Sequence, residues 1–538
     1  MEKKAPVFLR EATGLRKSIS PIDAFGLNTL TVNIGLGILF LAFLAPTSFP
    51  GGDMVFATIL TIIGCVIFAL AWSFVAAAMP RLGGDYVYVS RIVHPLLGVI
   101  SNWGVVLFGW LFDVVAIYIL VADSLSPSFY ALGYLMNNSA LTSLAGSVSG
   151  NTSVFLIGTA TITLLSLIVF LGTRYFVYVI RICWVVGIIG AAAALIAFLG
   201  VSPQQFAANV NAYAQSAIGV SNYYSSVLSG GSAGFAPVQP FSLQTVMIIP
   251  FVFFELGFFF YSSYIGVELK NVQKAQIYGM VLSVLVCGIF TALLAWAFEN
   301  TATYNFIYAS TNLYFTNATA YALPAPPYIN FFAMIGSGNV VLSLLIMIGF
   351  ICWGIIWTGV GTFYPPRNMM AWSFDHLGPS FLAQVHERFN TPHWGILVAA
   401  IGHYLLFALT FVAGSFILGL SATVGNLLFT FIPMAIAAII FPYASRSKEI
   451  FEQSPGLIKR KFGGIPIIVV LGIVSLVFLI MNVYFFLGNS AYGANSAPSL
   501  AVIVGAFVFA TLWYFIWKYY RKSQGIDVAL AYRQIPPE

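Results

Sequence analysis

Long apolar runs separated by short polar segments dominate this chain. A helix needs about 20 mostly apolar residues to cross the hydrocarbon core of a bilayer, and twelve runs meet that requirement. They lie near residues 22–45, 54–79, 96–122, 153–173, 176–200, 243–266, 276–298, 338–364, 394–414, 417–443, 465–488 and 498–518. They lack the short polar and apolar alternation that is typical of membrane β-strands. The pattern therefore predicts an all-α membrane protein with twelve transmembrane helices.

Composition supports this prediction and excludes several classes of protein. Apolar residues make up 60% of the 538 positions and charged residues 7%, against about 25% charged in a typical soluble domain. A disordered chain would be poor in these apolar residues. The net charge of +6 comes from residues spread along the chain, so a nucleic-acid partner is not expected. The first apolar run is long and follows some twenty polar and charged residues, which argues against a cleaved signal peptide.

The basic residues indicate how the chain is oriented. If the N-terminus is cytoplasmic, all 22 Lys and Arg residues fall in cytoplasmic tails, cytoplasmic loops or the adjoining helix ends. The positive-inside rule expects such a bias. We therefore predict a multi-pass protein of the cytoplasmic membrane, with the lipid bilayer as its surroundings and both termini in the cytoplasm.

The predicted external segments have an unusual composition. Residues 124–152, 201–242 and 300–331 contain no Asp, Glu, Lys or Arg. Short polar side chains are one sufficient explanation, and an acidic exterior, in which carboxylates would be protonated, is the other. The segments carry three glycosylation sequons, which begin at Asn137, Asn151 and Asn317. Such tripeptides are common by chance and give weak support to an external location.

The sequence offers no sign of a metal site, cofactor or disulfide framework. The four cysteines lie singly within predicted spans, at Cys65, Cys183, Cys287 and Cys352. His403 lies within the ninth span, where a single histidine is more often a packing residue than a ligand. No nucleophile elbow or phosphate loop is present, so an enzyme is not expected.

Two spans contain signals for an interrupted helix at membrane depth. In the first span, Gly35 and Gly37 are separated by one residue; unwinding there would expose backbone N–H groups that suit a carboxylate. Close packing of helices is the alternative explanation for these glycines. In the sixth span, Glu255 and Gly257 lie together in an apolar run. Interrupted helices at matching positions of two inverted halves are typical of transporter binding sites.

Four segments resemble the amino-acid permeases of the amino acid–polyamine–organocation superfamily. The first is Ile34-Gly35-Leu36-Gly37-Ile38, and the second is Pro80-Arg81-Leu82-Gly83-Gly84-Asp85-Tyr86-Val87-Tyr88, followed by Arg91. The third is Glu268-Leu269-Lys270-Asn271. The fourth comprises Arg367, Asp375-His376-Leu377-Gly378-Pro379, Val385-His386 with Arg388, and Thr391-Pro392. The second segment is the most specific of the four.

The resemblance implies two inverted five-helix repeats followed by two further helices. Residues 1–20 would form the N-terminal tail and 21–200 the first repeat. Residues 201–242 would form an external loop and 243–444 the second repeat. Residues 445–519 would carry the last two spans and 520–538 the C-terminal tail.

The resemblance also implies a substrate site between the two interruptions. The substrate carboxylate would be held by backbone amides of Gly35, Leu36 and Gly37, next to Ile34. Its amine would be held by carbonyl groups around Phe253, Phe254 and Glu255, at the break marked by Gly257. Phe253 or Phe258 would cover the bound molecule. The chain departs from the family pattern at Leu36, Ala42 and Val272, where a serine and two prolines are usual, and at Glu255, where the family residue is uncharged.

Three residues are candidates for coupling transport to an ion. Glu255 could carry a proton, bind a cationic group or pair with an interior partner. Asp113 lies within the third span, where a structural partner and a transport role are both open. Arg181 either fills the site of a coupling sodium ion or extends its side chain to the inner surface. Asp23 is expected to cap the first helix.

These features predict a secondary active transporter that moves amino acids by alternating access, as a proton symporter. Transport of polyamines or other organic cations is an alternative, although few acidic residues are available in the spans to bind them. Sodium coupling and exchange of one amino acid for another also remain open.

Overall fold

The computed structural model describes residues 15, 17–413 and 415–532 and is almost entirely helical. Eleven helical segments of this part of the chain are long and apolar enough to cross a bilayer, and a shorter apolar helix covers His393–Leu409. Each of the twelve predicted apolar runs therefore coincides with an apolar helical segment.

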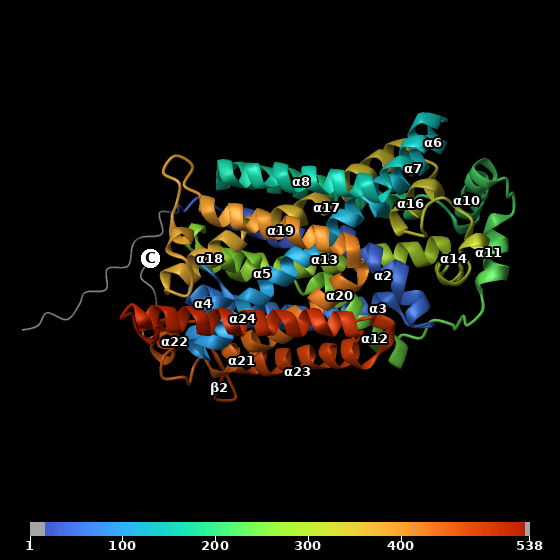
Figure 1. Ribbon diagram of the computed structural model, residues 1–538. Coiled ribbons are helices and arrows are strands. Elements are labelled where there is room, and N and C mark those ends of the chain that lie inside the picture. The colour runs from blue at the N-terminus through green and yellow to red at the C-terminus, as the bar shows by residue number, and fades with distance from the viewer. Residues whose placement is uncertain (1–14, 16, 414, 533–538) are drawn as a thin grey trace, which may run out of the picture.

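The helices of the membrane bundle lie roughly along one axis (Figure 1). They are α1 (Pro21–Val32), α2 (Ile34–Ser48), α3 (Met54–Ala78), α5 (Pro95–Tyr118), α8 (Asn151–Leu171), α9 (Thr173–Leu199), α12 (Leu243–Leu256), α13 (Val272–Ala302), α17 (Val340–Phe363), α19 (His393–Ala413), α20 (Ser415–Asn426), α21 (Ile432–Ile440), α23 (Ile467–Gly488) and α24 (Ala497–Ser523). Two π-helical segments continue such helices, η1 (Ile119–Leu125) after α5 and η5 (Leu427–Phe431) between α20 and α21.

Short elements cover the two ends of the bundle. One end carries α4 (Asp85–Ile92), η2 (Tyr261–Tyr264), η3 (Gly266–Glu268), α18 (Pro365–Phe374), η4 (Ser380–Ala383), α22 (Lys448–Gln453), the hairpin of β1 (Lys461–Phe462) and β2 (Ile465–Pro466), and η7 (Val528–Tyr532). The other end carries α6 (Ser126–Leu135), α7 (Ser139–Val148), α10 (Pro203–Ile218), α11 (Tyr223–Gly231), α14 (Tyr304–Thr316), α15 (Ala318–Tyr321), α16 (Ile329–Ser337) and η6 (Ser490–Tyr492).

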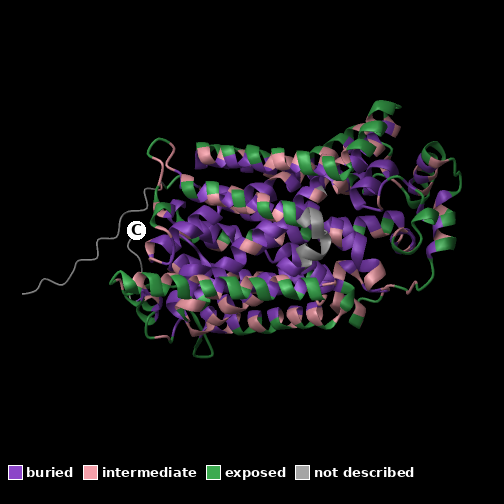
Figure 2. Ribbon diagram, viewed as in Figure 1, coloured by how far each residue is buried: buried purple, intermediate pink, exposed green. Residues whose placement is uncertain are grey.

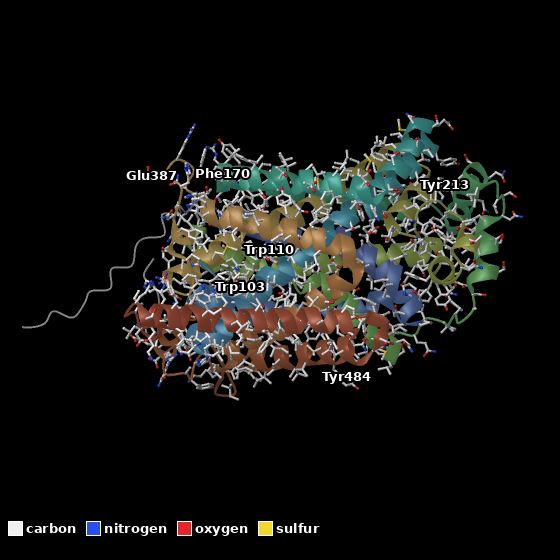
Figure 3. The ribbon with its side chains drawn as sticks, viewed as in Figure 1. Trp103, Trp110, Phe170, Tyr213, Glu387 and Tyr484 are labelled. Atoms are coloured by element: carbon white, nitrogen blue, oxygen red, sulfur yellow. The ribbon has the colours of Figure 1, made fainter. Side chains whose placement is uncertain are left out.

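Charge distinguishes these two ends. The described Lys and Arg residues belong to the connections, or the adjoining turns, at the end that carries α18, α22 and η7. We call this the basic end. In Figure 3, Glu387 and Phe170 lie at the basic end, and Tyr213 of α10 lies at the opposite end. The structure thus gathers the basic residues as predicted, and the side of the bilayer that each end faces remains a prediction.

Burial separates the centre of the bundle from its periphery. In Figure 2 the buried residues concentrate on the central helices, whereas α8, α23 and α24 alternate between buried and exposed positions. Many of the exposed side chains on these helices are large and apolar, such as Leu164, Val477 and Leu512. An apolar exterior on membrane-length helices suits contact with lipid. The chemistry of the protein is therefore expected in the central helices α1, α2, α5, α12 and α17.

Candidate functional site

The first span is interrupted at Asn33, between α1 and α2. Asn33 has a left-handed backbone (φ 66°), and its Oδ1 accepts a hydrogen bond from the Leu36 N–H at 3.0 Å. Its Nδ2 donates to the Trp353 carbonyl at 2.8 Å. The break was expected at Gly35 to Gly37, and that position is wrong by two residues. Asparagine adopts left-handed φ more readily than most residues, and its side chain caps the next helix.

Because the break lies at Asn33, the backbone amides that were predicted to bind a carboxylate belong to the start of a helix. Ile34, Gly35, Leu36 and Gly37 form the first turn of α2. The Leu36 N–H is bound to the Asn33 side chain, and the Gly37 N–H donates to the Asn33 carbonyl at 3.0 Å. The Trp353 indole packs so closely on Gly35 that a Cβ there would overlap it. The N-terminal turn of α2 is thus covered by Trp353 in this conformation.

The sixth span is interrupted where the sequence predicted. α12 ends at Leu256 with Gly257 as its C-cap, and turns lead into η2. The Thr31 hydroxyl of α1 donates to the Phe258 carbonyl at 2.9 Å. Asn28 of α1 exchanges two hydrogen bonds of 2.9 Å with the side chain and backbone of Ser262. These bonds join the first interrupted span directly to the segment that follows the second interruption.

Glu255 lies in the last turn of α12, against the first turn of α2. Its Oε1 accepts a hydrogen bond of 2.7 Å from the Thr291 hydroxyl of α13. Its Oε2 is buried and has no hydrogen-bond partner among the described residues. A Cβ on Gly37 would overlap the Glu255 carboxyl group. Gly37 therefore leaves the space that this carboxyl group occupies, and a proton or cation at Oε2 would complete its bonding.

Phe254 and Phe258 belong to an aromatic cluster in the middle of the bundle. Phe112 of α5 lies 4.7 Å from Phe254 and 4.8 Å from Phe258, measured between ring centroids. Trp357 lies 4.6 Å from Phe112. Phe253 instead contacts rings on other helices, Phe431 at 6.0 Å and Phe478 at 5.7 Å. Of the two predicted covering residues, Phe258 is the one that shares this cluster with Phe254.

Arg181 and Asp23 form an ion pair near the basic end. The Arg181 Nε lies 2.7 Å from Asp23 Oδ1, and a second guanidinium nitrogen lies 3.1 Å from Oδ2. The Arg181 side chain is 53% exposed, whereas Asp23 is buried. Asp23 also forms a capping box with Ser20 at the start of α1, as predicted. Arg181 thus tethers α9 to the start of α1.

Asp113 faces a residue that sequence reasoning treated as packing. His403 Nε2 of α19 lies 3.5 Å from Asp113 Oδ2 of α5, and both side chains are buried. Gly361 of α17 is pressed against the pair, since a Cβ there would overlap the carboxyl group. Both residues were visible in the sequence as polar side chains within spans. Their pairing was not, because it depends on how α5 and α19 pack.

Comparison with known protein families agrees with this architecture. The family model of the amino acid permeases matches residues 19–509, which is most of the chain. The chain belongs to this permease family of the amino acid–polyamine–organocation superfamily. It is a family of transporters and not of enzymes. Among curated proteins, none matches the chain significantly.

The permease motifs meet at the basic end in two clusters of charge. In the first cluster, Arg367 Nε lies 2.6 Å from Glu268 Oε1, and the Thr173 hydroxyl contacts both side chains. In the second, Arg91 lies 2.6 Å from Asp375, which also accepts a hydrogen bond of 2.8 Å from Tyr86. Each cluster joins two motif segments that are far apart in the sequence.

Asp85 of the most specific motif is buried beside these clusters. Its Oδ2 accepts a hydrogen bond of 2.5 Å from Ser101, and its Oδ1 accepts one of 2.8 Å from Asn102. Asn102 in turn accepts a bond of 2.7 Å from the Trp372 indole. Burial raises the pKa of Asp85 to about 6, and the hydrogen bonds partly oppose that rise. The permease motif thus holds a buried carboxyl group whose pKa lies well above that of an exposed aspartate.

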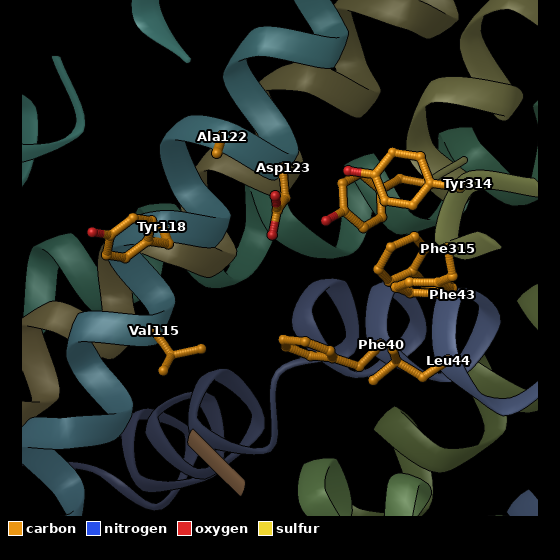
Figure 4. Close-up of a pocket in the computed structure, with 10 residues that line it drawn as sticks. Phe40, Phe43, Leu44, Val115, Tyr118, Ala122, Asp123, Tyr314 and Phe315 are labelled. Carbon is orange, nitrogen blue, oxygen red and sulfur yellow. The ribbon is translucent and has the colours of Figure 1, made fainter. Parts of the chain in front are cut away.

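A cavity of about 370 Å³ lies on the side of the bundle away from the basic end, next to α14, and Figure 4 shows the residues that line it. The second half of α2, the α5–η1 segment, α14 and Tyr328 surround it, and six of its ten lining residues are aromatic. Asp123 is the single charged residue among the lining residues. It was missed in the sequence, although it is the last charged residue before the uncharged segment 124–152. Phe40 separates the cavity from the aromatic cluster, with its ring 5.1 Å from Phe254.

Proposed function

We propose that the permease is a secondary active transporter that moves amino acids across the cytoplasmic membrane by alternating access. The observation that carries this proposal is the pair of interrupted spans, broken at Asn33 and Gly257 and joined by the bonds from Thr31 and Asn28. Interrupted helices free backbone groups for a ligand where an intact helix would hide them. A carboxyl group with an unpaired oxygen, Glu255, lies between the two breaks.

We propose the inverted-repeat topology, with repeats over 21–200 and 243–444, on the pairing of equivalent helices. α3 packs on α13, α5 on α17, and α8 on α19, which are the second, third and fourth spans of each half. α2 likewise packs on α12. A two-fold relation between halves would bring equivalent helices together in this way. The gathering of basic residues at one end supports cytoplasmic termini.

The amino-acid substrate would bind between the two breaks. Its carboxylate would replace Trp353 at the first turn of α2, around Gly35, where helix N-terminal amides favour an anion. Its amine would lie toward the last turn of α12, near Phe254 and Glu255. Since Trp353 covers Gly35 here, binding requires α17 to move relative to α2. That requirement agrees with an alternating-access cycle.

We propose a proton as the coupling ion and Glu255 as its carrier. For a buried carboxyl group with one hydrogen-bonded and one unpaired oxygen, the neutral form has a low free-energy cost of burial and the charged form a high one. The carboxyl group can take up a proton when an aqueous path to one side of the membrane opens and release the proton when a path to the other side opens. Asp113, beside His403, is the second candidate. Arg181 is less suited, because its guanidinium is engaged by Asp23 and half exposed.

The proposal is tested with purified protein in lipid vesicles. Uptake of a panel of radiolabelled amino acids is measured with an imposed pH gradient, with a sodium gradient and with neither gradient. We expect accumulation that requires the pH gradient and is unaffected by sodium. Uptake that requires an unlabelled amino acid inside the vesicle, in place of either gradient, would show an exchanger and overturn the coupling.

Glu255→Gln provides the residue-level test. The amide can still accept the Thr291 hydrogen bond but cannot release a proton. We expect gradient-driven accumulation to fall at least about tenfold, while exchange of internal for external substrate persists. Glu452→Gln, an exposed carboxylate at the basic end, is the matched control and should transport normally. Unchanged accumulation by Glu255→Gln would remove Glu255 from the mechanism.

A further inference from the structure

The cavity beside Asp123 has the chemistry of a cation site. Phe43 forms one wall with Tyr314, Phe315 and Tyr328, at ring-centroid distances of 5.5, 4.9 and 4.7 Å. Figure 4 shows the Asp123 carboxyl group directed into the space between Tyr118 and Tyr314, above Phe40. Aromatic faces attract organic cations through the ring quadrupole. A carboxylate set among such faces adds a charged hydrogen-bond acceptor.

The Asp123 carboxyl group retains capacity for a ligand. The Tyr328 phenol supplies a hydrogen bond to it, and a carboxylate has four lone-pair positions to satisfy. Among the lining residues that the structure describes, none is Lys, Arg or His. No cation of the protein therefore competes for this carboxyl group within the cavity, and the structure offers an anionic ligand no charged partner there.

The basic residues of the protein lie away from the cavity. The described Lys and Arg residues all lie toward the basic end. No fixed positive charge of a described Lys or Arg residue is therefore close enough to repel an organic cation at the end that holds the cavity. The cavity volume of about 370 Å³ lies within the range for small-molecule sites.

We propose that this cavity binds the ammonium group of an organic cation. The ammonium would pair with Asp123, and the carbon skeleton of the ligand would lie against Phe40, Phe43 and Phe315. Phe40 lines the cavity, and its ring also contacts Phe254 beside the second break. Whether the bound cation is also cargo rests on the proposed transport function.

Three related compounds test the binding site directly. Phenylalanine is the zwitterion, phenethylamine keeps its ring and ammonium without the carboxylate, and 3-phenylpropionate keeps the ring and carboxylate without the ammonium. Binding to the purified protein is measured by isothermal titration calorimetry. We expect phenethylamine to bind most tightly, phenylalanine at least about tenfold more weakly, and 3-phenylpropionate not measurably. Equal affinity for the amine and the anion would overturn the proposal.

Two variants place the ligand in the cavity. Asp123→Asn removes the charge and should weaken phenethylamine at least about tenfold, whereas Asp53→Asn, an acid of the same end outside the cavity lining, should not. Phe315→Arg adds a cation to a half-exposed wall position and should abolish amine binding. Phe241→Arg adds the same charge at an exposed site and is its control. If Asp123→Asn does not fold, the test rests on Phe315→Arg. Phenethylamine affinity that is unchanged in Phe315→Arg would then overturn the proposal.

Transport measurements separate this inference from the proposed function. If vesicles accumulate amino acids but phenethylamine affinity is unchanged in Phe315→Arg and Asp123→Asn, the cation site is wrong and the transporter stands. If phenethylamine binds in a manner dependent on Asp123 but no compound of the panel is transported, the cation site stands and the transport proposal fails. Competition between phenethylamine and transported amino acids then shows whether the bound cation is cargo.

Discussion

Arg367 donates hydrogen bonds to both carboxylate oxygens of Glu268, at 2.6 and 3.2 Å, and both side chains are buried. The remaining guanidinium nitrogen of Arg367, Nη1, donates to the Phe363 carbonyl, and Thr173 bonds to both members of the pair. The ion pair thus fixes η3, which follows the second break, to α18 and to the start of α9.

Removing one member of this pair is predicted to destabilise the protein strongly. Arg367→Met leaves Glu268 buried without its cation, and Glu268→Met leaves the guanidinium without its anion. Loss of one partner of a buried ion pair costs about 3–5 kcal/mol. Because the double variant removes both charges, its loss should be clearly smaller than the sum of the two. Chemical denaturation in detergent measures these free energies.

The exposed pair Lys448 and Glu452 is the control for this prediction. Lys448 Nζ lies 3.9 Å from Glu452 Oε1 on one face of α22, and both side chains are largely exposed. Lys448→Met should change stability by less than about 0.5 kcal/mol. Additive losses in the Arg367 and Glu268 variants would show that the two charges act independently.

Asn33 provides a second prediction, because its conformation and its side chain can be separated. Asn33→Ala places a Cβ-bearing residue in left-handed φ, at a cost of about 1–2 kcal/mol, and removes the cap on Leu36 and the bond to Trp353. Asn33→Gly loses the same two bonds but adopts the conformation freely. We expect Asn33→Ala to be the less stable of the two in thermal unfolding. Equal stability would mean that the backbone at this break is not strained.

Asn33→Asp isolates the contact with α17. Aspartate can still accept the Leu36 N–H but has no donor for the Trp353 carbonyl. If that donor holds Trp353 over Gly35, the variant should open the first turn of α2 more readily. Faster hydrogen–deuterium exchange in peptides that contain residues 34–37 would report the opening. Exchange at the wild-type rate would contradict it.

The contact between Asp113 and His403 predicts energetic coupling. Asp113→Asn and His403→Leu each remove one member of a buried polar pair, and the other loses the partner that faces it. Residues in direct contact show coupling free energies of about 0.5–3 kcal/mol in double-mutant cycles. We expect a value in that range from unfolding measurements on the two single variants and the double variant. Strict additivity would show that the 3.5 Å approach carries no interaction.

Asp85 predicts a pH-dependent contribution to stability. Its pKa in the folded protein is about 6, above the ordinary value of 3.8, because burial penalises the charged form. The folded state therefore binds the proton more tightly than the unfolded chain. The contribution is fully present below about pH 4 and is lost as the pH rises through about 6. A shift of about two pH units corresponds to about 3 kcal/mol.

The measurement compares the wild type with Asp85→Asn at several pH values. The amide does not titrate, so the stability of the wild type minus that of the variant should fall by about 2 to 3 kcal/mol between pH 4 and pH 7. Glu449→Gln, at an exposed position, is the control for replacing a carboxyl group by an amide. A flat difference for Asp85→Asn would show that Asp85 is already ionised at pH 4.

The helical spans could be predicted from the sequence because membrane crossing is set by a local property, the length of an apolar run. The break at Gly257 was also predicted from a local signal, because the two residues that indicated it, Glu255 and Gly257, are close together in the chain. The break at Asn33 was misplaced because glycine and asparagine both permit left-handed φ. The choice between them depends on a hydrogen bond to Trp353, on a distant helix.

The contacts between helices could not be read from the sequence. His403 and Asp113 belong to spans that the pattern treats separately, and Asp123 acquires meaning only when α2 and α14 bring aromatic rings around it. The partners of Glu268 and Asp375 could not be predicted either. The motifs that contain these two acids and their partners Arg367 and Arg91 were nevertheless recognised. Motifs identified the residues, and packing determined which of them meet.

The last described residue, Tyr532, lies within the charge cluster of the basic end. Its hydroxyl is 3.0 Å from that of Tyr86, its ring lies 4.8 Å beneath the Arg91 guanidinium, and its side chain is buried. Any movement that separates α4 from Asp375, the C-cap residue of α18, must therefore break the contacts of Tyr532 in η7. A protease that cleaves near residue 532, or a fluorophore attached there, would serve as a reporter that distinguishes the open and closed states of this end during turnover.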